Sequence, residues 1–194
     1  MDVNPKGWLL IVPHNEAQAL KTRINLNDEE KKSLKTRFIL VRHGETSWNL
    51  EGRYQGQIDT PLSPVGIKQG KLVAEALKNV PLDAVYTSPL SRSYETAMMC
   101  ADLHGLKVDK DERLLEINHG KWEGLYATEI EGQYPDLLER WRSTVVDVQM
   151  PDGESIEDVR KRGYNVRKNS DGVNIFVIII WNRRSPTFLN GSIQ

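Results

Sequence analysis

The chain has 194 residues, of which 39% are hydrophobic, and this is enough for one globular domain with a sizeable core. The 26 Lys and Arg residues nearly balance the 27 Asp and Glu residues, so a net charge of -1 offers no overall basic field for nucleic acid or an anionic membrane. The single cysteine excludes an internal disulfide and makes a reducing cytoplasm the expected location.

Residues 1–36 are polar and finish in a charge-rich stretch, so we expect an N-terminal arm or linker. The apolar run from Trp8 to Val12 is too short to span a bilayer and lacks the features of a signal peptide. No paired Cys and His spacing indicates structural zinc.

From Arg37 onward, short β-branched runs alternate with longer helical patterns. This alternation predicts an α/β fold, a three-layer sandwich with a mostly parallel central sheet flanked by helices and incomplete at its C-terminal end. Expected strands cover residues 37–41, 83–88, 114–117 and 173–180, while helices are expected to start after Ser63, Ser88 and Ser155 and to run on both sides of Pro135. Residues 181–194 show no helical or strand period and are expected to form an irregular tail.

The segment LVRHGETSWN places Arg42 and His43 directly after an apolar strand. Open α/β folds bind ligands at this edge of the sheet. An arginine fork can hold phosphate oxygens, and an imidazole can attack phosphorus and carry the phosphoryl group covalently. The alternative is a surface His beside an Arg with no chemical role.

A second strand ends in TSPLSRSYET, which places Arg92 in the first turn of the next helix. A positive charge there opposes the helix dipole. A bound anion would remove this conflict, because the helix N-terminus and Arg92 would then both face negative charge.

In the segment LLEINHGKWEG, Glu116 stands at the end of an apolar run. A carboxylic acid there can protonate the leaving alkoxide of a phosphate ester and then activate water, provided that partial burial raises its pKa. The alternative is a solvated charge at the end of a strand.

Together with RYQGQIDTPLSPVG and PDGESIEDVRKR, these segments resemble the motifs of the histidine phosphatase superfamily, the phosphoglycerate mutase and acid phosphatase group, in the expected order. The resemblance covers residues 37–162, about two-thirds of the chain. It implies that His43 is the nucleophile, that Arg42 and Arg92 clamp the phosphate, and that Glu116 donates the proton.

The resemblance further implies that Asn49 hydrogen-bonds the phosphate or positions His43, and that Gln55 and Gly56 lie at the mouth of the phosphate pocket. It implies no metal and no cofactor. The partner would be a small-molecule phosphate ester, such as phosphoserine or a sugar phosphate, with no nucleic acid or membrane involved, and the oligomeric state is left open.

Residues 116–124 are more similar to the broad phosphatases of the family than to its glycolytic mutases, so we expect hydrolysis. Two alternatives stay open: phosphoglycerate mutase-type transfer, and a non-catalytic remnant that binds phosphate.

Family members carry a second histidine just after the last core strand, whereas this sequence has no histidine beyond His119. We therefore expect activity to be impaired, with His119 as a poor substitute. The domain is expected to span residues 37–180, and the unpatterned end suggests a reading-frame slip or a truncated gene. Residues 7–20 loosely resemble the closing strand of a preceding phosphatase domain, although the sequence favours an ordinary polar N-terminal arm.

Overall fold

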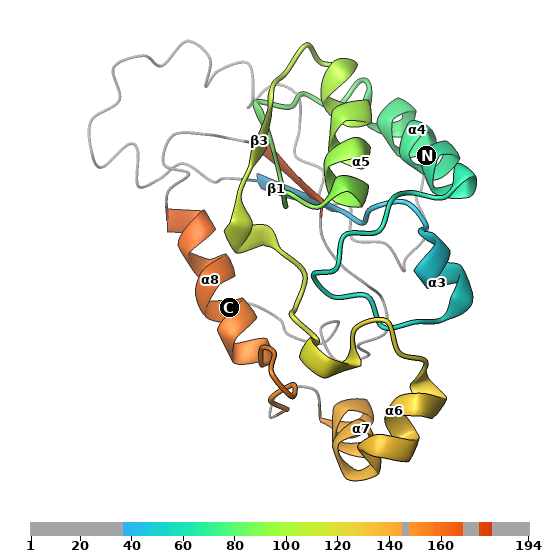
Figure 1. Ribbon diagram of the computed structural model, residues 1–194. Helices are drawn as coiled ribbons and strands as arrows, with labels where there is room; N and C mark the ends of the chain where they lie inside the picture. Colours follow the sequence, from blue (N-terminus) through green and yellow to red (C-terminus); the bar gives the residue numbers. More distant parts are fainter. Residues whose placement is uncertain (1–36, 145–147, 169–174, 180–194) are drawn as a thin grey trace.

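The structure is a computed structural model that describes residues 37–144, 148–168 and 175–179 (Figure 1). The expected N-terminal arm and C-terminal tail lie outside these ranges. The described elements, in chain order, are β1 Arg37–Val41, α3 Ser47–Glu51, α4 Pro64–Leu77, β2 Ala84–Thr87, α5 Ser91–Asp102, β3 Val108–Lys110, η1 Glu112–Leu114, η2 Gly120–Trp122, α6 Ala127–Gln133, α7 Pro135–Ser143, α8 Ile156–Lys168 and β4 Ile175–Ile179.

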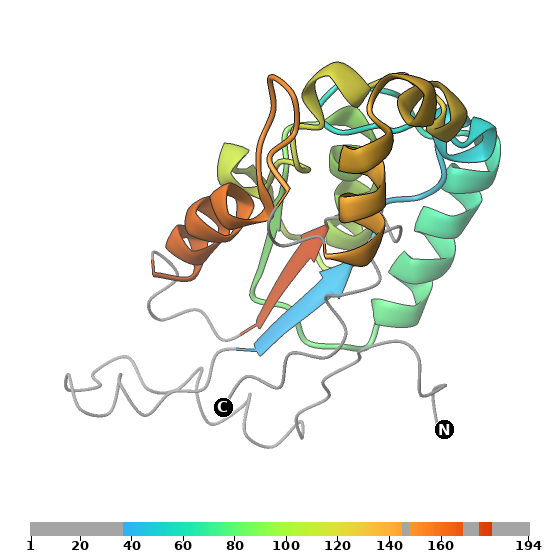
Figure 2. The ribbon, with the colours of Figure 1, turned by 90° about the horizontal axis from the view of Figure 1, so that it is seen from below.

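The four described strands form one parallel sheet in the order β1-β4-β2-β3. The last of them in the sequence, β4, lies between β1 and β2, and Figure 2 shows β1 and β4 side by side and pointing the same way. In register, Ile179 pairs with both Val41 and Thr87. The carboxyl ends of these three strands therefore meet at one edge, where open α/β sheets bind ligands.

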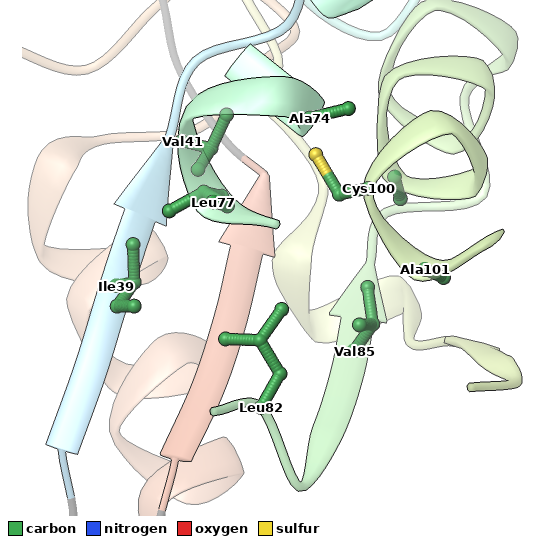
Figure 3. Packing of buried hydrophobic residues seen from close by; sticks show 9 residues of the cluster. Ile39, Val41, Ala74, Leu77, Leu82, Val85, Cys100 and Ala101 are labelled. Atoms are coloured by element: carbon green, nitrogen blue, oxygen red, sulfur yellow. The ribbon is translucent and has the colours of Figure 1, made fainter. Parts of the chain in front are cut away.

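Helices α4 and α5 cover one face of this sheet and pack against each other. Apolar side chains from the strands β1 and β2 and from the helices α4 and α5 meet there (Figure 3). The cluster consists of Ile39, Val41, Ala74, Leu77, Leu82, Val85, Ala97, Cys100 and Ala101. Burying this much apolar area holds the strands, and hence their carboxyl ends, in fixed positions.

A second apolar cluster lies around α6 and α7; we call it the tryptophan cluster. It consists of Tyr54, Ile117, Trp122, Ile130, Leu138, Trp141, Val148, Met150 and Ile156. Tyr54 and Ile117, which lie in irregular segments between the elements, belong to this cluster, so its packing holds those segments in place.

Helix α8 lies on the side of the sheet away from α4 and α5 and contacts η1 (Figure 1). The parallel sheet is thus flanked by helices, which confirms the predicted fold class. Leu40, whose side chain alternates with those of Ile39 and Val41 along β1, is 65% exposed. The described elements therefore leave part of this second face uncovered.

Local signals predicted several boundaries correctly. Ser63 caps α4, its hydroxyl accepting from the Gly66 N–H with Pro64 at the first helical position. Pro135 separates α6 from α7. Ser155 and Asp158 form the predicted capping box at the start of α8, each side chain accepting from the other's backbone N–H.

Two predictions about elements were wrong. Residues 114–117 are not a strand: η1 occupies 112–114 and an irregular segment follows, because the carbonyls of Arg113, Leu115 and Glu116 bond to the Arg162 guanidinium instead of to a neighbouring strand. The edge strand is instead β3, which the pattern did not indicate.

Helix α5 begins at Ser91, not after Ser88 and Pro89. Its N-terminus has no side-chain cap from Leu90; instead, the Asp59 carboxylate accepts from the Ser91 N–H and hydroxyl, both at 2.8 Å. The cap therefore comes from a distant loop, which no local pattern could indicate.

Candidate active site

His43 is the second residue after β1 and is only 6% exposed. Its Nδ1 lies 2.7 Å from the carbonyl oxygen of Gly44, and the Nε–H of Arg92 points at its Nε2 from 3.3 Å. A carbonyl only accepts and a guanidinium only donates, so Nδ1 carries the proton and Nε2 carries the lone pair. The nitrogen with the lone pair is therefore the one that faces Arg92.

The pKa of His43 is lowered to about 4, mainly by burial; the hydrogen bond to Gly44 acts against this shift, and the charges of Arg92 and Arg42 contribute to it. At neutral pH the imidazole is uncharged. This is the protonation state in which a histidine can act as a nucleophile.

Arg92, the second residue of α5, is 1% exposed. Its two terminal nitrogens donate to the carbonyls of Ile58 and Gly56, at 3.0 and 2.6 Å. Burial lowers the pKa of its guanidinium, and the carboxylates of Glu116, Asp59 and Glu123 raise it. The sequence predicted a bound anion at the start of α5. The carboxylate of Asp59 supplies a negative charge at this position, so the helix start alone is weaker evidence for a bound phosphate.

Glu116 is 5% exposed, and its Oε1 accepts from the Ile117 N–H at 3.0 Å. It is a buried carboxyl, not the solvated strand-end charge that was the alternative. Its electrostatic effect on Arg92 places it in the same cluster as His43 and Arg92. The irregular backbone around it is held by Arg162, as described above.

Arg42 is exposed, but it lies close enough to His43 to lower its pKa. The loop that follows packs tightly on α4: a Cβ at Gly44 would overlap the backbone of Gly66 in the first turn of that helix. The Gly44 N–H also donates to the Thr96 hydroxyl on α5, at 3.2 Å. Position 44 therefore requires a glycine, because the backbones of the loop and of α4 approach too closely for a side chain. This close packing fixes the position of His43 against α4 and α5.

Asn49 and Gln55 have partners within the protein. The Asn49 amide caps α3 by accepting from the Thr46 N–H at 3.1 Å, and it donates to Gln55 at 3.0 Å. Gln55 is buried, and the hydroxyls of Thr46 and Thr60 bond to its amide. Gln55 is thus a buried residue that holds the loop, and its place at the mouth of a phosphate pocket stays a prediction. Gly56, by contrast, contributes its carbonyl to Arg92.

His119 is buried between the rings of Tyr54 and Trp141, with centroids 5.3 and 5.6 Å away in edge-on contacts. Burial lowers its pKa to about 4. Its Nδ1 has no hydrogen-bond partner within the described part of the chain. These contacts are those of a residue packed against the tryptophan cluster, so they do not favour His119 as a substitute for a second active-site histidine.

Sequence reasoning missed the residues that hold the site together. Glu123, Gln57, Glu154 and Arg162 join the loop at residues 56–58 to the segment carrying Glu116. All four lie inside the matched motifs, but their partners are mostly backbone groups far away in the sequence. Among the described residues, no group of three His, Cys, Asp or Glu side chains could hold a metal ion, and no described helix is long and apolar enough to cross a membrane.

A neutral histidine, a buried arginine and a buried carboxyl group at the carboxyl edge of a parallel sheet define an α/β protein with the groups needed for phosphoryl transfer through histidine. The sequence matches the histidine phosphatase superfamily (branch 1) over residues 38–171. The chain belongs to this superfamily.

Three relatives illustrate the similarity. Phosphoserine phosphatase 1 of Hydrogenobacter thermophilus is 42% identical over 140 residues, which cover 66% of this chain and 66% of that protein. "Probable phosphoglycerate mutase GpmB" of Yersinia enterocolitica is 40% identical over 128 residues, 64% of this chain and 58% of the relative. The mycobacterial glucosyl-3-phosphoglycerate phosphatase, solved with VO3, is 31% identical with a TM-score of 0.69 and 75% of each chain covered. The chain thus spans less than two-thirds of the length of the first two relatives.

Proposed function

We propose that this protein is a phosphomonoesterase that hydrolyses a small phosphorylated metabolite through a phosphohistidine on His43. One observation supports this most strongly: the buried His43 is neutral and presents the lone pair of Nε2 toward the Arg92 guanidinium. Membership of the histidine phosphatase superfamily supports the same chemistry.

In the first step, the Nε2 lone pair attacks phosphorus and the bond from phosphorus to the ester oxygen breaks. Protonated Glu116 gives its proton to the leaving alkoxide, while Arg92 and Arg42 offset the negative charge that develops on the phosphoryl oxygens. A phosphate oxygen would replace the long contact between Arg92 and His43.

In the second step, water attacks the phosphohistidine, the carboxylate of Glu116 accepts the proton of that water, and the nitrogen–phosphorus bond breaks. Inorganic phosphate leaves and His43 returns to its neutral form. These two reaction steps use no metal or cofactor, because phosphoryl transfer requires mainly positioning and charge neutralisation.

Phosphoserine and sugar-acid phosphates are the substrate classes we propose, following the names of the phosphatase relatives. A second candidate reaction is transfer of the phosphoryl group to a substrate hydroxyl instead of to water, and the relative named as a phosphoglycerate mutase supports it. A reducing cytoplasm stays the proposed location, in accord with the buried free thiol of Cys100, whose pKa burial raises to about 11.

Family members have a second histidine after the last core strand, which donates a hydrogen bond to the phosphoryl group. The sequence has no histidine beyond His119, so it does not provide this donor. Loss of one donor to a developing oxyanion costs on the order of a hundredfold to a thousandfold in rate. We therefore expect slow turnover, with phosphate binding less affected. The domain we propose for this activity spans residues 37–180.

The test is hydrolysis of p-nitrophenyl phosphate by the wild-type chain and by His43→Ala. We expect slow wild-type turnover, no turnover in the variant, and an acid-labile, base-stable phosphoryl label on the wild type alone. Equal turnover in both proteins would contradict the role of His43. Phosphate binding without any turnover or label in the wild type would instead establish the non-catalytic remnant.

A further inference from the structure

The carboxylate of Glu123 accepts three backbone N–H groups from two separate segments. Its Oε1 accepts from Gln57 at 2.8 Å and from His119 at 3.1 Å, and its Oε2 accepts from Ile58 at 2.9 Å. The carboxylate packs directly against Gly56, where a Cβ would overlap it. Glu123 therefore fixes both the position and the close packing of the loop at residues 56–58.

The opposite side of the same loop holds Arg92. The carbonyl of Gly56 and the N–H of Gln57 belong to one peptide group: the first accepts from Arg92 and the second donates to Glu123. The carbonyl of Ile58 accepts from the other terminal nitrogen of Arg92. Because an anion and a cation polarise one peptide group from its two ends, both hydrogen bonds are strengthened.

We propose that Glu123 is a positioning residue that sets the orientation of the Arg92 guanidinium against His43, acting through the backbone of residues 56–58. Arg92 is anchored to that loop at both terminal nitrogens, which leaves its Nε–H directed at His43. The consequence for catalysis rests on the proposed phosphatase function, whereas the effect on Arg92 itself does not.

The bond from His119 extends the role of Glu123 to the proton donor. The N–H of His119 belongs to the irregular segment that also carries Glu116, so one carboxylate joins the loop behind Arg92 to the segment of Glu116. Gln57 reinforces this connection, since its amide donates to the Glu116 carbonyl at 3.0 Å. Glu123 thus fixes the position of Arg92 relative to Glu116.

The variant Glu123→Gln tests the proposal with a side chain of the same size. Its carbonyl can keep the Gln57 and His119 bonds, but its amide nitrogen would face the N–H of Ile58, donor against donor. We expect the Ile58 contact with Arg92 to loosen. Glu129→Gln is the matched control, because Glu129 also accepts a backbone N–H, that of Tyr126 at 2.7 Å, on the exposed start of α6.

Three measurements are compared in wild type, E123Q and E129Q: kcat and KM for p-nitrophenyl phosphate, the Kd of inorganic phosphate by calorimetry, and the Nε–H signal of Arg92 in proton–nitrogen NMR. In E123Q we expect kcat/KM to fall roughly tenfold to a hundredfold, in line with small misplacements of catalytic groups. We also expect weaker phosphate binding and a shifted or broadened Arg92 signal. E129Q should match the wild type in all three.

A wild-type Arg92 signal and phosphate Kd in folded E123Q would overturn the proposal, even if the melting temperature fell. If the wild type binds phosphate without turnover while E123Q still alters the Arg92 signal, the positioning role stands and the phosphatase proposal fails. Circular dichroism checks folding. Should E123Q not fold, Glu123→Asp, with its shorter reach to the same loop, is judged by the same Arg92 signal.

Discussion

At His43, one hydrogen bond and the burial of the ring determine the chemistry that the side chain can perform. The Gly44 carbonyl fixes the proton on Nδ1, and burial keeps the ring uncharged. Sequence reasoning identified His43, Arg92 and Glu116 because each stands beside the end of an apolar run or the start of a helix. It could not find Glu123, two of whose three partners are backbone N–H groups of a loop 65 and 66 residues away. Backbone partners leave no residue signature in a sequence.

The two buried histidines predict a specific pH dependence of stability. Each has a folded-state pKa of about 4, below the value of 6.5 that applies in the unfolded chain. Between these values the unfolded chain binds more protons, so the free energy of unfolding falls as pH drops from 6.5 toward 4. Each histidine should account for a loss on the order of 2–3 kcal/mol.

Urea unfolding at a series of pH values from 7 to 4 measures this loss. His119→Phe keeps an aromatic ring between Tyr54 and Trp141 but cannot bind a proton, so its loss over that range should be smaller than that of the wild type by the share of one histidine. A pH profile identical to that of the wild type would show that His119 does not stay neutral in the folded protein.

At the scale of elements, α8 acts on the site from a distance. Arg162 on this helix donates to the carbonyls of Arg113, Leu115 and Glu116 and pairs with Glu154 at 2.9 Å. The apolar run at residues 114–117 favoured a strand, yet these bonds hold it as irregular backbone. Capping signals at Ser63 and Ser155 predicted helix starts well because the residues involved are close together in the sequence. The hydrogen bonds from Arg162 reach a segment far away in the sequence, so no local pattern indicates them.

Arg162→Lys should therefore lower the free energy of unfolding by about 2 kcal/mol, because a lysine cannot replace the planar fork that reaches three carbonyls and a carboxylate. Turnover should fall with it, since the main chain at Glu116 loses a donor. Urea unfolding and the aryl phosphate assay check both effects.

Arg160→Lys on the same helix is the control for this experiment. Arg160 forms an exposed ion pair with Glu157, so the change should stay within about 0.5 kcal/mol. Equal effects of the two substitutions would mean that Arg162 serves only as a surface charge.

For the whole molecule, β4 is the strand that joins β1 to the pair formed by β2 and β3. In the described sheet β1 pairs with β4 alone, and β4 also pairs with β2. The alternation of strand and helix patterns predicted the fold class, and the apolar run at residues 173–180 predicted a strand that the structure describes at Ile175–Ile179. Strand order was beyond the sequence, because it depends on pairing between distant segments.

Val177→Pro tests this central position. Val177 pairs in register with Ile39 on one side and Val85 on the other, and a proline there removes an N–H from the middle of the sheet. We expect a loss of about 3 kcal/mol or more and a loss of cooperative unfolding, measured by circular dichroism during a urea titration. Val177→Ala keeps the N–H and should unfold cooperatively. Native-like, cooperative unfolding of the proline variant would contradict the central placement of β4.

The same strand order has a consequence for synthesis on the ribosome. The first strand of the described sheet emerges from the exit tunnel long before its partner β4 has been translated, with β2, β3 and all of the described helices in between. Contacts between such distant segments form slowly, and an apolar strand stays unpaired in the meantime. The nascent polypeptide therefore completes this sheet only after β4 has emerged, and until then β1 lacks its partner strand.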